Sequence, residues 1–258
     1  MEHSLFSLTD RVAIVTGSGR SIGKAIALAL ADAGAHVVAA ARTSAEIEAT
    51  ASEVKAKGRK ALAVPTDVTD STQMNDLVQK TVREFGRLDI MVNNAGGQWI
   101  IAPMLELTEE YFDEVIKLSL KSVFSGCKAA AQVMVEQKSG SIINMSSTAG
   151  IMLNPGRIAY SAAKAGVVNL TQNLAMELGP YNIRVNALAP GLIVTERTKV
   201  LASKDPAVFE TRRKNTALKR LGAPEEVAGA AVYLASDASS YVTGNLLVIS
   251  GGLHTLVT

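Results

Sequence analysis

The stretch VAIVTGSGRSIG, residues 12–23, decides the fold of this chain. Its first four residues are apolar and mostly β-branched, which predicts a buried strand, and the glycines Gly17, Gly19 and Gly23 follow at once. An Ala-rich pattern of helical period runs from Ile22 to Ala33. Glycines between a strand and a helix let backbone N–H groups approach a pyrophosphate, whose charge the helix N-terminus favours. The order of strand, turn and helix therefore predicts a dinucleotide-binding unit.

The same alternation of strand and helix continues along the chain. Continuous apolar runs predict seven strands, at residues 12–15, 37–40, 61–64, 90–92, 141–145, 183–187 and 246–249. Helical patterns lie at residues 22–33, 44–57, 71–85, within 109–137 and at 159–178, and glycines end four of them. Strands that are apolar on both faces are typical of a parallel sheet with helices on both sides. The pattern predicts an α/β fold with a doubly wound parallel sheet, the Rossmann arrangement.

The domain organisation is simple, because no linker, repeat or low-complexity segment interrupts the pattern. Residues 1–258 are expected to form one domain. The only irregular stretch is residues 191–221, which carries Pro206 and many charges. A long, partly helical insertion after the carboxyl end of a strand is where a substrate lid would lie.

The composition excludes several classes of function. A net charge of +2 over 258 residues is too small to indicate a nucleic-acid surface. The single cysteine, Cys127, rules out a disulfide framework within one chain, and its expected role is that of a small buried apolar residue. The three histidines are scattered, so no metal site is expected. We see neither a signal peptide nor an apolar run of roughly 20 residues, and we expect a cytoplasmic protein without membrane contact.

Three side chains supply the parts for moving a proton to or from an alcohol. Tyr160 and Lys164 stand at i and i+4, one helical turn apart, and Ser147 follows the fifth predicted strand. An ammonium beside a phenol stabilises the phenolate, which lets the phenol both give and take a proton. A serine hydroxyl can donate to the same substrate oxygen. Beside a dinucleotide site, this set predicts interconversion of a ketone and a secondary alcohol by hydride transfer.

With these residues in view, the chain resembles the short-chain dehydrogenase/reductase family over essentially its whole length. The markers, in chain order, are Thr16-Gly17 with Gly23, Asp67, Asn93-Asn94-Ala95-Gly96, Ser147, Tyr160, Lys164, Pro190-Gly191 and Thr195. Ser21 stands where the family has the middle glycine of its turn. A hydroxyl there can cap free N–H groups of the helix or touch a phosphate. The run from Arg220 to Val227 is similar to 3-oxoacyl reductases, although other relatives share it.

The cofactor expected from the charges is NADP, with NADPH preferred over NADH. NAD binders usually place a carboxylate at the end of the second strand, but here Ala41 is followed by Arg42. Arg20 in the turn is a second cation, and in similar reductases basic residues at these two positions pair with the 2′-phosphate. The resemblance implies these cofactor contacts: Gly17, Ser18, Gly19, Arg20, Ser21, Ile22, Arg42, Asp67, Val68, Asn94, Ala95, Gly96, Tyr160, Lys164, Pro190, Gly191, Ile193 and Thr195.

The resemblance also implies the catalytic roles. Tyr160 is expected to be the general acid/base, Ser147 the donor that orients the substrate oxygen, and Lys164 the electrostatic partner that also holds the nicotinamide ribose. The family usually has an asparagine in the long helix after the fourth strand, and Ser119 takes its place. Serine can bond back to a helix carbonyl and bend the helix. Ser119 is therefore expected either to support an altered proton relay or to be a passive substitute.

The substrate is less defined than the reaction. Gln98, Trp99, Met152 and Leu153 are the expected substrate contacts and suggest a partly apolar pocket, or ordinary core and subunit contacts. A 3-oxoacyl thioester fits the resemblance, although only Lys138 of two expected acyl-carrier docking cations is present. An enoyl-thioester reductase is an alternative, and a non-catalytic dinucleotide sensor or scaffold is an alternative of another class. By resemblance, the partners are a small carbonyl or alcohol substrate and further copies of the chain in a homotetramer.

Overall fold

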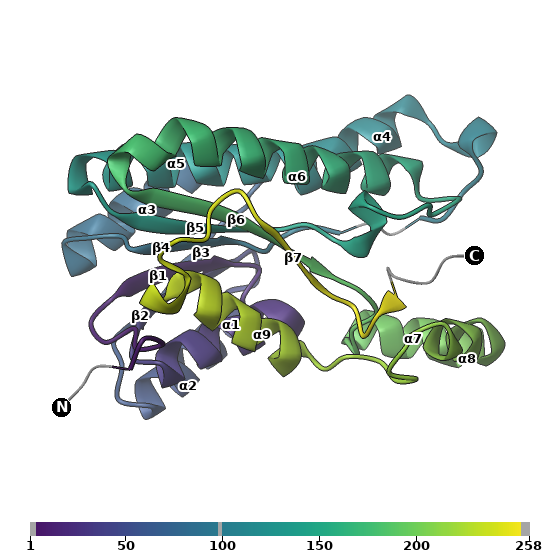
Figure 1. Cartoon of the computed structure of the whole chain (residues 1–258), viewed down its shortest axis with the longest axis horizontal. Coiled ribbons are helices and arrows are strands. Elements are labelled where there is room, and N and C mark those ends of the chain that lie inside the picture. Colours follow the sequence, from purple (N-terminus) through teal and green to yellow (C-terminus); the bar gives the residue numbers. More distant parts are fainter. Residues whose placement is uncertain (1–3, 98–99, 254–258) are drawn as a thin grey trace.

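The computed structural model describes residues 4–97 and 100–253, except the side chains of residues 197, 201 and 208. Its centre is a sheet of seven parallel strands (Figure 1) in the order β3-β2-β1-β4-β5-β6-β7. The strands are β1 (Val12–Thr16), β2 (His36–Ala41), β3 (Ala61–Pro65), β4 (Ile90–Asn93), β5 (Gly140–Met145), β6 (Ile183–Pro190) and β7 (Leu246–Ile249). The expected single domain with a doubly wound parallel sheet is confirmed, and each strand begins and ends within three residues of its predicted bounds.

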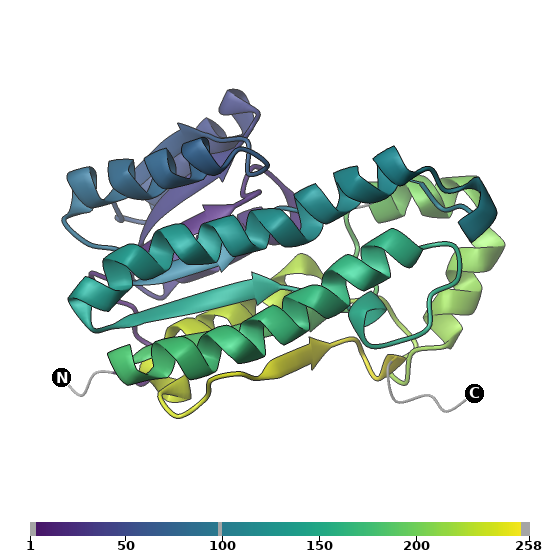
Figure 2. The ribbon, with the colours of Figure 1, turned by 90° about the horizontal axis from the view of Figure 1, so that it is seen from above.

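Helices cover both faces of the sheet. They are α1 (Ser21–Asp32), α2 (Ser44–Ala56), α3 (Ser71–Phe85), α4 (Glu109–Ile116), α5 (Ser122–Gln137), α6 (Ile158–Leu178), α7 (Glu196–Lys204), α8 (Pro206–Lys214) and α9 (Pro224–Ala235). Figures 1 and 2 show α3, α5 and α6 on one face and α1, α2 and α9 on the other. α7 and α8 lie beyond the sheet, on the side of the carboxyl ends of β6 and β7.

Burial on both faces explains the continuous apolar strands. In β1, Ile14 packs into the core beneath α3, α5 and α6, whereas Ala13 and Val15 pack into the core beneath α1 and α9. All three are fully buried. Complete burial of a side chain such as Ile14 contributes about 1.5–3 kcal/mol. Because successive residues of a strand face opposite sides, a strand covered on both sides must be apolar throughout.

The strand order places a topological switch point between β1 and β4. From β1 the chain winds to β2 and β3 on one side, then crosses back to β4 and continues to β7 on the other. The connections after β1 and after β4 therefore leave in opposite directions. In open α/β sheets, ligands bind at this switch point, outside the carboxyl ends of the strands.

Two helical features differ from the sequence expectations. The expected long helix within residues 109–137 is interrupted by a π-helical turn, Lys117–Lys121, which separates α4 from α5. Helix α9 was not anticipated, although Pro224 in its first turn is a common start signal. The backbone N–H of Ala223 also donates to Glu226 (2.8 Å), which fixes the beginning of α9.

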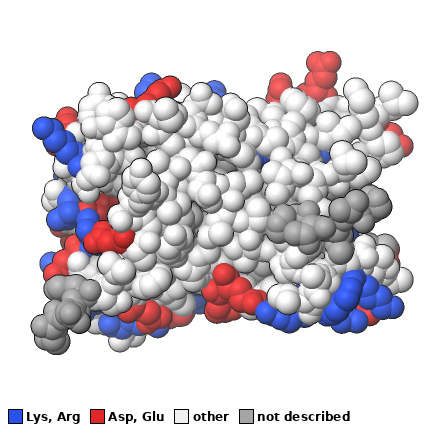
Figure 3. Space-filling view, viewed as in Figure 1, with Lys and Arg blue, Asp and Glu red and all other residues white. Residues whose placement is uncertain are grey.

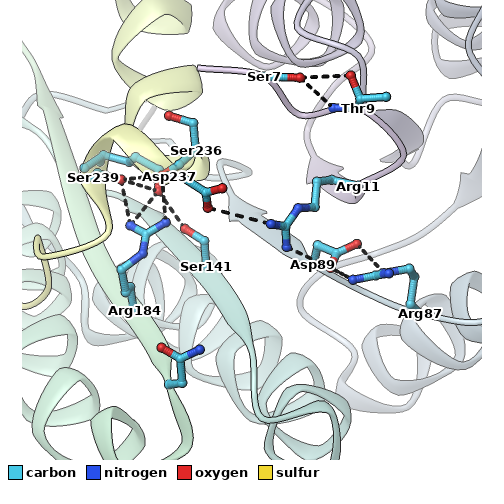
Figure 4. Close-up of polar contacts among 12 residues, drawn as sticks. Ser7, Thr9, Arg11, Arg87, Asp89, Ser141, Arg184, Ser236, Asp237 and Ser239 are labelled. Carbon is cyan, nitrogen blue, oxygen red and sulfur yellow. Dashed lines mark hydrogen bonds and ion pairs between the residues drawn. The ribbon is translucent and has the colours of Figure 1, made fainter. Parts of the chain in front are cut away.

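A charged cluster connects the amino ends of the strands, at the edge of the sheet opposite the switch point (Figure 4). Asp89 is buried and accepts two hydrogen bonds from the guanidinium of Arg87, at 2.8 and 2.6 Å. Arg11 lies 3.7 Å from both Asp89 and Asp237. Arg184 donates to three acceptors in the segment at the end of α9. These contacts tie the end of α9 to the sheet.

Candidate active site

The predicted site residues converge because strands β1, β4, β5 and β6 are neighbours. Their carboxyl ends share one edge of the sheet, so the segments that follow them lie along that edge. The glycine turn follows β1, residues 94–97 follow β4, Ser147 follows β5 and Gly191 follows β6. α6 brings Tyr160 and Lys164 to the same edge, where Lys164 contacts the last residue of β5.

The loops after β1 and β4 are braced against each other. The hydroxyl of Thr16 donates to the carbonyl oxygen of Val92 (3.2 Å) and accepts from the backbone N–H groups of Asn94 (3.0 Å) and Ala95 (3.1 Å). The side-chain amide of Asn94 donates to the carbonyl oxygens of Thr16 (2.8 Å) and Gly17 (3.3 Å). Asn94 therefore holds the glycine turn in position, a role that its expected assignment as a cofactor contact did not include.

The glycines of the turn are required by close approaches. Gly17 has φ +66°, and a Cβ there would lie 2.9 Å from the amide nitrogen of Asn94. A Cβ at Gly23 would collide with the carbonyl oxygen of Gly17, so only glycine lets α1 approach the turn this closely. Ser18 turns its hydroxyl inward, where it accepts from the backbone N–H of Ala40 (3.0 Å). Ser18 is fully buried, and its backbone N–H and carbonyl oxygen also have partners, in Ala40 and Thr50 respectively.

Ser21 is strained and its hydroxyl is unsatisfied. The residue has φ +54°, in the left-handed region where glycine is favoured. Its Oγ is buried and has no hydrogen-bond partner within the described part of the chain. Of the two roles considered for this hydroxyl, the capping of free N–H groups of α1 is not observed, because the hydroxyl forms no hydrogen bond with the described residues. An uncapped helix N-terminus beside an orphaned hydroxyl suits an anion such as a pyrophosphate.

The two cations expected at the 2′-phosphate have different surroundings. Arg42, just after β2, is exposed and forms no ion pair with any described residue. Arg20 is also exposed, but its Nη1 lies 3.7 Å from Oε1 of Glu46 in the first turn of α2. Sequence reasoning did not single out Glu46, because 26 residues separate it from Arg20. A carboxylate therefore stands beside the expected phosphate site.

Two of the expected cofactor contacts, Asp67 and Val68, follow β3. One carboxylate oxygen of Asp67 accepts from the backbone N–H and the hydroxyl of Thr69, both at 2.9 Å, which shapes the turn before α3. Val68 is buried in the core beneath α3. The other carboxylate oxygen of Asp67 accepts no hydrogen bond from the described residues of this turn, so it can still accept one from a ligand.

Lys164 is a buried cation on α6, at this edge of the sheet. Its side chain is 2% exposed, and its Nζ donates to the carbonyl oxygen of Met145 (2.6 Å). Desolvation by burial lowers the pKa of Lys164 to about 8, which leaves it mostly protonated at neutral pH. The hydroxyl of Ser146 donates to the backbone carbonyl of Lys164 (2.9 Å) and ties α6 to the end of β5. The Nζ lies 5.6 Å from the centroid of the Tyr160 ring.

Ser147 begins a short 3₁₀ turn, Thr148–Gly150, directly after β5. Its hydroxyl accepts from the backbone N–H of Ala149 (3.2 Å), which leaves the hydroxyl proton available to donate to another group. A Cβ at Gly150 would lie 2.7 Å from the backbone of Lys164, so this turn packs directly on α6. The packing fixes the position of Ser147 relative to the helix that carries Tyr160 and Lys164.

Ser119 is buried in the π-helical turn and faces the loop after β4. Its hydroxyl donates to the carbonyl oxygen of Gly97 (3.1 Å) and lies 3.4 Å from the backbone nitrogen of the same residue. The expected bond from Ser119 back to its own helix does not form. The bend comes from the π-helical turn, and the hydroxyl joins this turn to the loop. The loop in turn approaches Lys164, since a Cβ at Gly96 would lie 3.4 Å from Nζ.

The two ends of the segment 191–221 lie side by side, next to the carboxyl end of β6. Backbone bonds between residues 192–194 and Gly222 close its base, and α7 and α8 form the excursion. Pro190 ends β6, Gly191 packs against Ser250 and Ile193 is buried in the core. The hydroxyl of Thr195 accepts from the backbone N–H of Thr198 (3.2 Å) at the start of α7.

The expected substrate residues are not all assembled. Gln98 and Trp99 lie outside the described residues. Leu153 is 98% exposed, so it closes no pocket within a single chain, whereas Met152 is half-buried. Within residues 4–97 and 100–253, no group of His, Cys, Asp and Glu side chains could hold a metal ion. No helix in these ranges could cross a membrane.

Comparison with known families and proteins gives matches over nearly the whole chain. The family model described as enoyl-(acyl carrier protein) reductase matches residues 17–254. The 3-oxoacyl-[acyl-carrier-protein] reductase FabG of Thermotoga maritima is 42% identical over 246 residues, which cover 95% of this chain and 98% of the relative. The 3-oxoacyl-[acyl-carrier-protein] reductase of Synechocystis is 43% identical over 249 residues, 96% of this chain and 98% of the relative.

Solved structures agree with these matches. A short-chain type dehydrogenase/reductase from Mycobacterium marinum is 41% identical with a TM-score of 0.91, over 96% of this chain and 97% of that chain. A 7α-hydroxysteroid dehydrogenase complexed with NADH and 7-oxo glycochenodeoxycholic acid is 34% identical with a TM-score of 0.92, over 96% and 95%. The family match covers the glycine turn from Gly17 to Gly23 and the whole of α6, which carries Tyr160 and Lys164.

Proposed function

The chain belongs to the short-chain dehydrogenase/reductase family, and from that premise we propose that it is an NADPH-dependent ketoreductase acting on 3-oxoacyl thioesters. Membership makes it an oxidoreductase that acts on carbonyl or alcohol groups with a nicotinamide dinucleotide, rather than a non-catalytic sensor or scaffold. The observation that carries the proposal is the buried Lys164 below Tyr160 at the edge of the sheet, next to the glycine turn.

The proposed chemistry assigns each of three side chains one task. NADPH supplies the hydride when it is bound. Tyr160 donates its phenolic proton to the carbonyl oxygen as that oxygen gains charge, and Ser147 donates a hydrogen bond to the same oxygen. The ammonium of Lys164, fixed by Met145, stabilises the phenolate that remains on Tyr160. Low solvent exposure of Lys164 strengthens this electrostatic effect.

The residues around the turn support a phosphate-bearing cofactor. We propose that the uncapped start of α1 and the Ser21 hydroxyl hold the pyrophosphate, and that Arg20 and Arg42 hold the 2′-phosphate of NADPH. Asp67 is assigned to the adenine and residues 94–96 to the neighbouring ribose. The absence of an acidic residue at Ala41 or Arg42 supports NADPH over NADH.

The substrate assignment rests on the names of the relatives. Two relatives above 40% identity are 3-oxoacyl-[acyl-carrier-protein] reductases, which supports a 3-oxoacyl thioester. We propose that residues 191–221 close over it as a lid, because α7 and α8 extend beyond the carboxyl ends of β6 and β7 (Figure 1). The family model's description keeps enoyl-thioester reduction as the second candidate, although Tyr160 and Lys164 favour a ketone.

A homotetramer is the proposed assembly. Figure 3 shows a face on which charged side chains lie mainly at the margins. Large apolar side chains are exposed on the outer helices, including Phe124 on α5 (47% exposed) and Met176 on α6 (81% exposed). Association of these helices between copies would bury such side chains. Sedimentation of the purified protein tests the number of copies, and a monomer at micromolar concentration would contradict the assembly.

The proposed reaction is tested by a substrate panel with matched variants. The wild-type protein is assayed with NADPH and NADH against 3-oxoacyl and enoyl thioesters of coenzyme A. We expect oxidation of NADPH with the 3-oxoacyl thioester and little with the enoyl thioester. Tyr160→Phe should lose turnover and keep NADPH binding, measured by cofactor fluorescence. Substantial turnover by Tyr160→Phe would disprove the role of the phenol, and selective enoyl reduction would favour the second candidate.

A further inference from the structure

Glu46 is held directly over the glycine turn. It lies in the first turn of α2, where its side chain is 36% exposed. The hydroxyl of Thr50 donates to the carbonyl oxygens of both Glu46 (3.1 Å) and Ser18 (3.0 Å), which joins this part of α2 to the turn. A Cβ at Gly19 would lie 2.7 Å from both Cβ and Oε2 of Glu46. The side chain of Glu46 therefore packs directly against Gly19, where any larger residue would collide with it.

The carboxylate also faces the cation assigned to the 2′-phosphate. Its Oε1 is 3.7 Å from Nη1 of Arg20, longer than a hydrogen bond, and the Arg20 side chain is 65% exposed. A loose, exposed pair of this kind holds the guanidinium weakly. Arg20 is therefore free to bind another anion, but it would do so with the charge of Glu46 beside it.

We infer that Glu46 is a specificity-determining residue that moderates the preference for NADPH over NADH, an inference that rests on the proposed function. A phosphate bound to Arg20 would lie within about 7 Å of the Glu46 carboxylate. Like charges at that separation repel even in a water-like medium, and the 2′-phosphate carries nearly two charges. The 2′-hydroxyl of NADH is neutral and can donate a hydrogen bond to a carboxylate. The charge of Glu46 therefore weakens NADPH binding selectively.

The test compares Glu46→Gln with the wild type by titrating each cofactor and following its fluorescence, which requires no turnover. We expect the Kd for NADPH to fall about three- to tenfold, and the Kd for NADH to stay within about twofold or to rise. The gain should shrink as salt is raised, because solvent-exposed charges are screened. An unchanged or larger Kd for NADPH, or an equal gain for both cofactors, would overturn the inference.

Glu48→Gln is the matched control. Glu48 lies two residues further along α2, is exposed, and forms no ion pair within the described part of the chain. The Glu48→Gln variant loses the same charge from the same helix, and its Kd values for both cofactors should match those of the wild type within about twofold. The double variant Arg20→Gln/Glu46→Gln is compared with Arg20→Gln alone. If Glu46 acts by repelling the phosphate, the double variant should bind NADPH more tightly. If Glu46 acts only by occupying Arg20, the two variants should bind NADPH equally. Either outcome supports a role in specificity and identifies its route.

The outcome is separable from the proposed cofactor preference. The ratio of the wild-type Kd values tests whether the protein prefers NADPH. The change in that ratio in Glu46→Gln tests the role of Glu46. A wild type that binds NADH more tightly than NADPH would refute the proposed cofactor preference. The inference about Glu46 would still be tested in that case, because the ratio of Kd values in Glu46→Gln must shift toward NADPH.

Discussion

Replacing Ser21 with glycine should stabilise the free protein. Ser21 has φ +54°, and a non-glycine residue in the left-handed region costs about 1 kcal/mol. Its buried hydroxyl has no partner among the described residues, which costs about 1–3 kcal/mol more. Glycine gains chain entropy in the unfolded state and gives back roughly 0.5–1 kcal/mol. The sum predicts that Ser21→Gly raises the free energy of unfolding by about 1–3.5 kcal/mol.

The assay is thermal and urea unfolding without cofactor. At roughly 2–4 °C per kcal/mol for a chain of this size, the Tm should rise by about 2–14 °C. Ser21→Ala removes only the hydroxyl and keeps the backbone strain, so its gain should be smaller than that of glycine. Ser161→Ala is a control for the hydroxyl, because the Oγ of Ser161 is also buried and has no partner among the described residues, but it lies within α6. A Tm of Ser21→Gly at or below that of the wild type would refute the reasoning.

Cofactor binding gives the second part of this prediction. If the hydroxyl of Ser21 donates to a phosphate, both variants should bind NADPH roughly 10- to 100-fold more weakly, since a hydrogen bond to a charged group contributes about 1.5–3 kcal/mol. The free protein would then be more stable and the complex weaker in the same variant. Unchanged affinity in both variants would show that the strain at Ser21 serves no phosphate contact.

Three further predictions follow from other buried groups. Asp89→Ala should lower the free energy of unfolding by about 2–4 kcal/mol in urea, because Arg87 and the backbone N–H of Val12 lose their acceptor; a loss below about 1 kcal/mol would contradict this. Cys127 is buried and its pKa is raised to about 12 by desolvation, so a thiol reagent should modify it only after unfolding, and rapid labelling of the native protein would contradict this. The pKa of Lys164 falls from 10.5 when unfolded to about 8 when folded, so the unfolded state binds more protons between these values. The wild type should therefore gain about 3 kcal/mol relative to Lys164→Met as the pH rises from about 8 to 10.5, and a constant difference between their unfolding curves would refute this.

The amino-acid sequence by itself determined the fold and the chemical parts of the site. The strands were predictable because both faces of the sheet are covered, which forces continuous apolar runs that can be read locally. The turn at residues 12–23 was predictable because glycine spacing between a strand and a helix has few other uses. Tyr160 and Lys164 share a helix face by their spacing alone.

Only the tertiary structure decided how these parts are held and what surrounds them. The hydroxyl of Ser119 donates to Gly97, which is 22 residues away in the sequence. Local pattern could not show this contact, and it suggested a bond within the helix of Ser119 instead. Glu46 meets Arg20 only because α2 packs beside the turn, and the unsatisfied hydroxyl of Ser21 depends on a backbone angle and on burial. Periodicity and spacing report local geometry. Contacts between distant segments depend on how the layers pack, and that packing controls the charge and strain at the cofactor site.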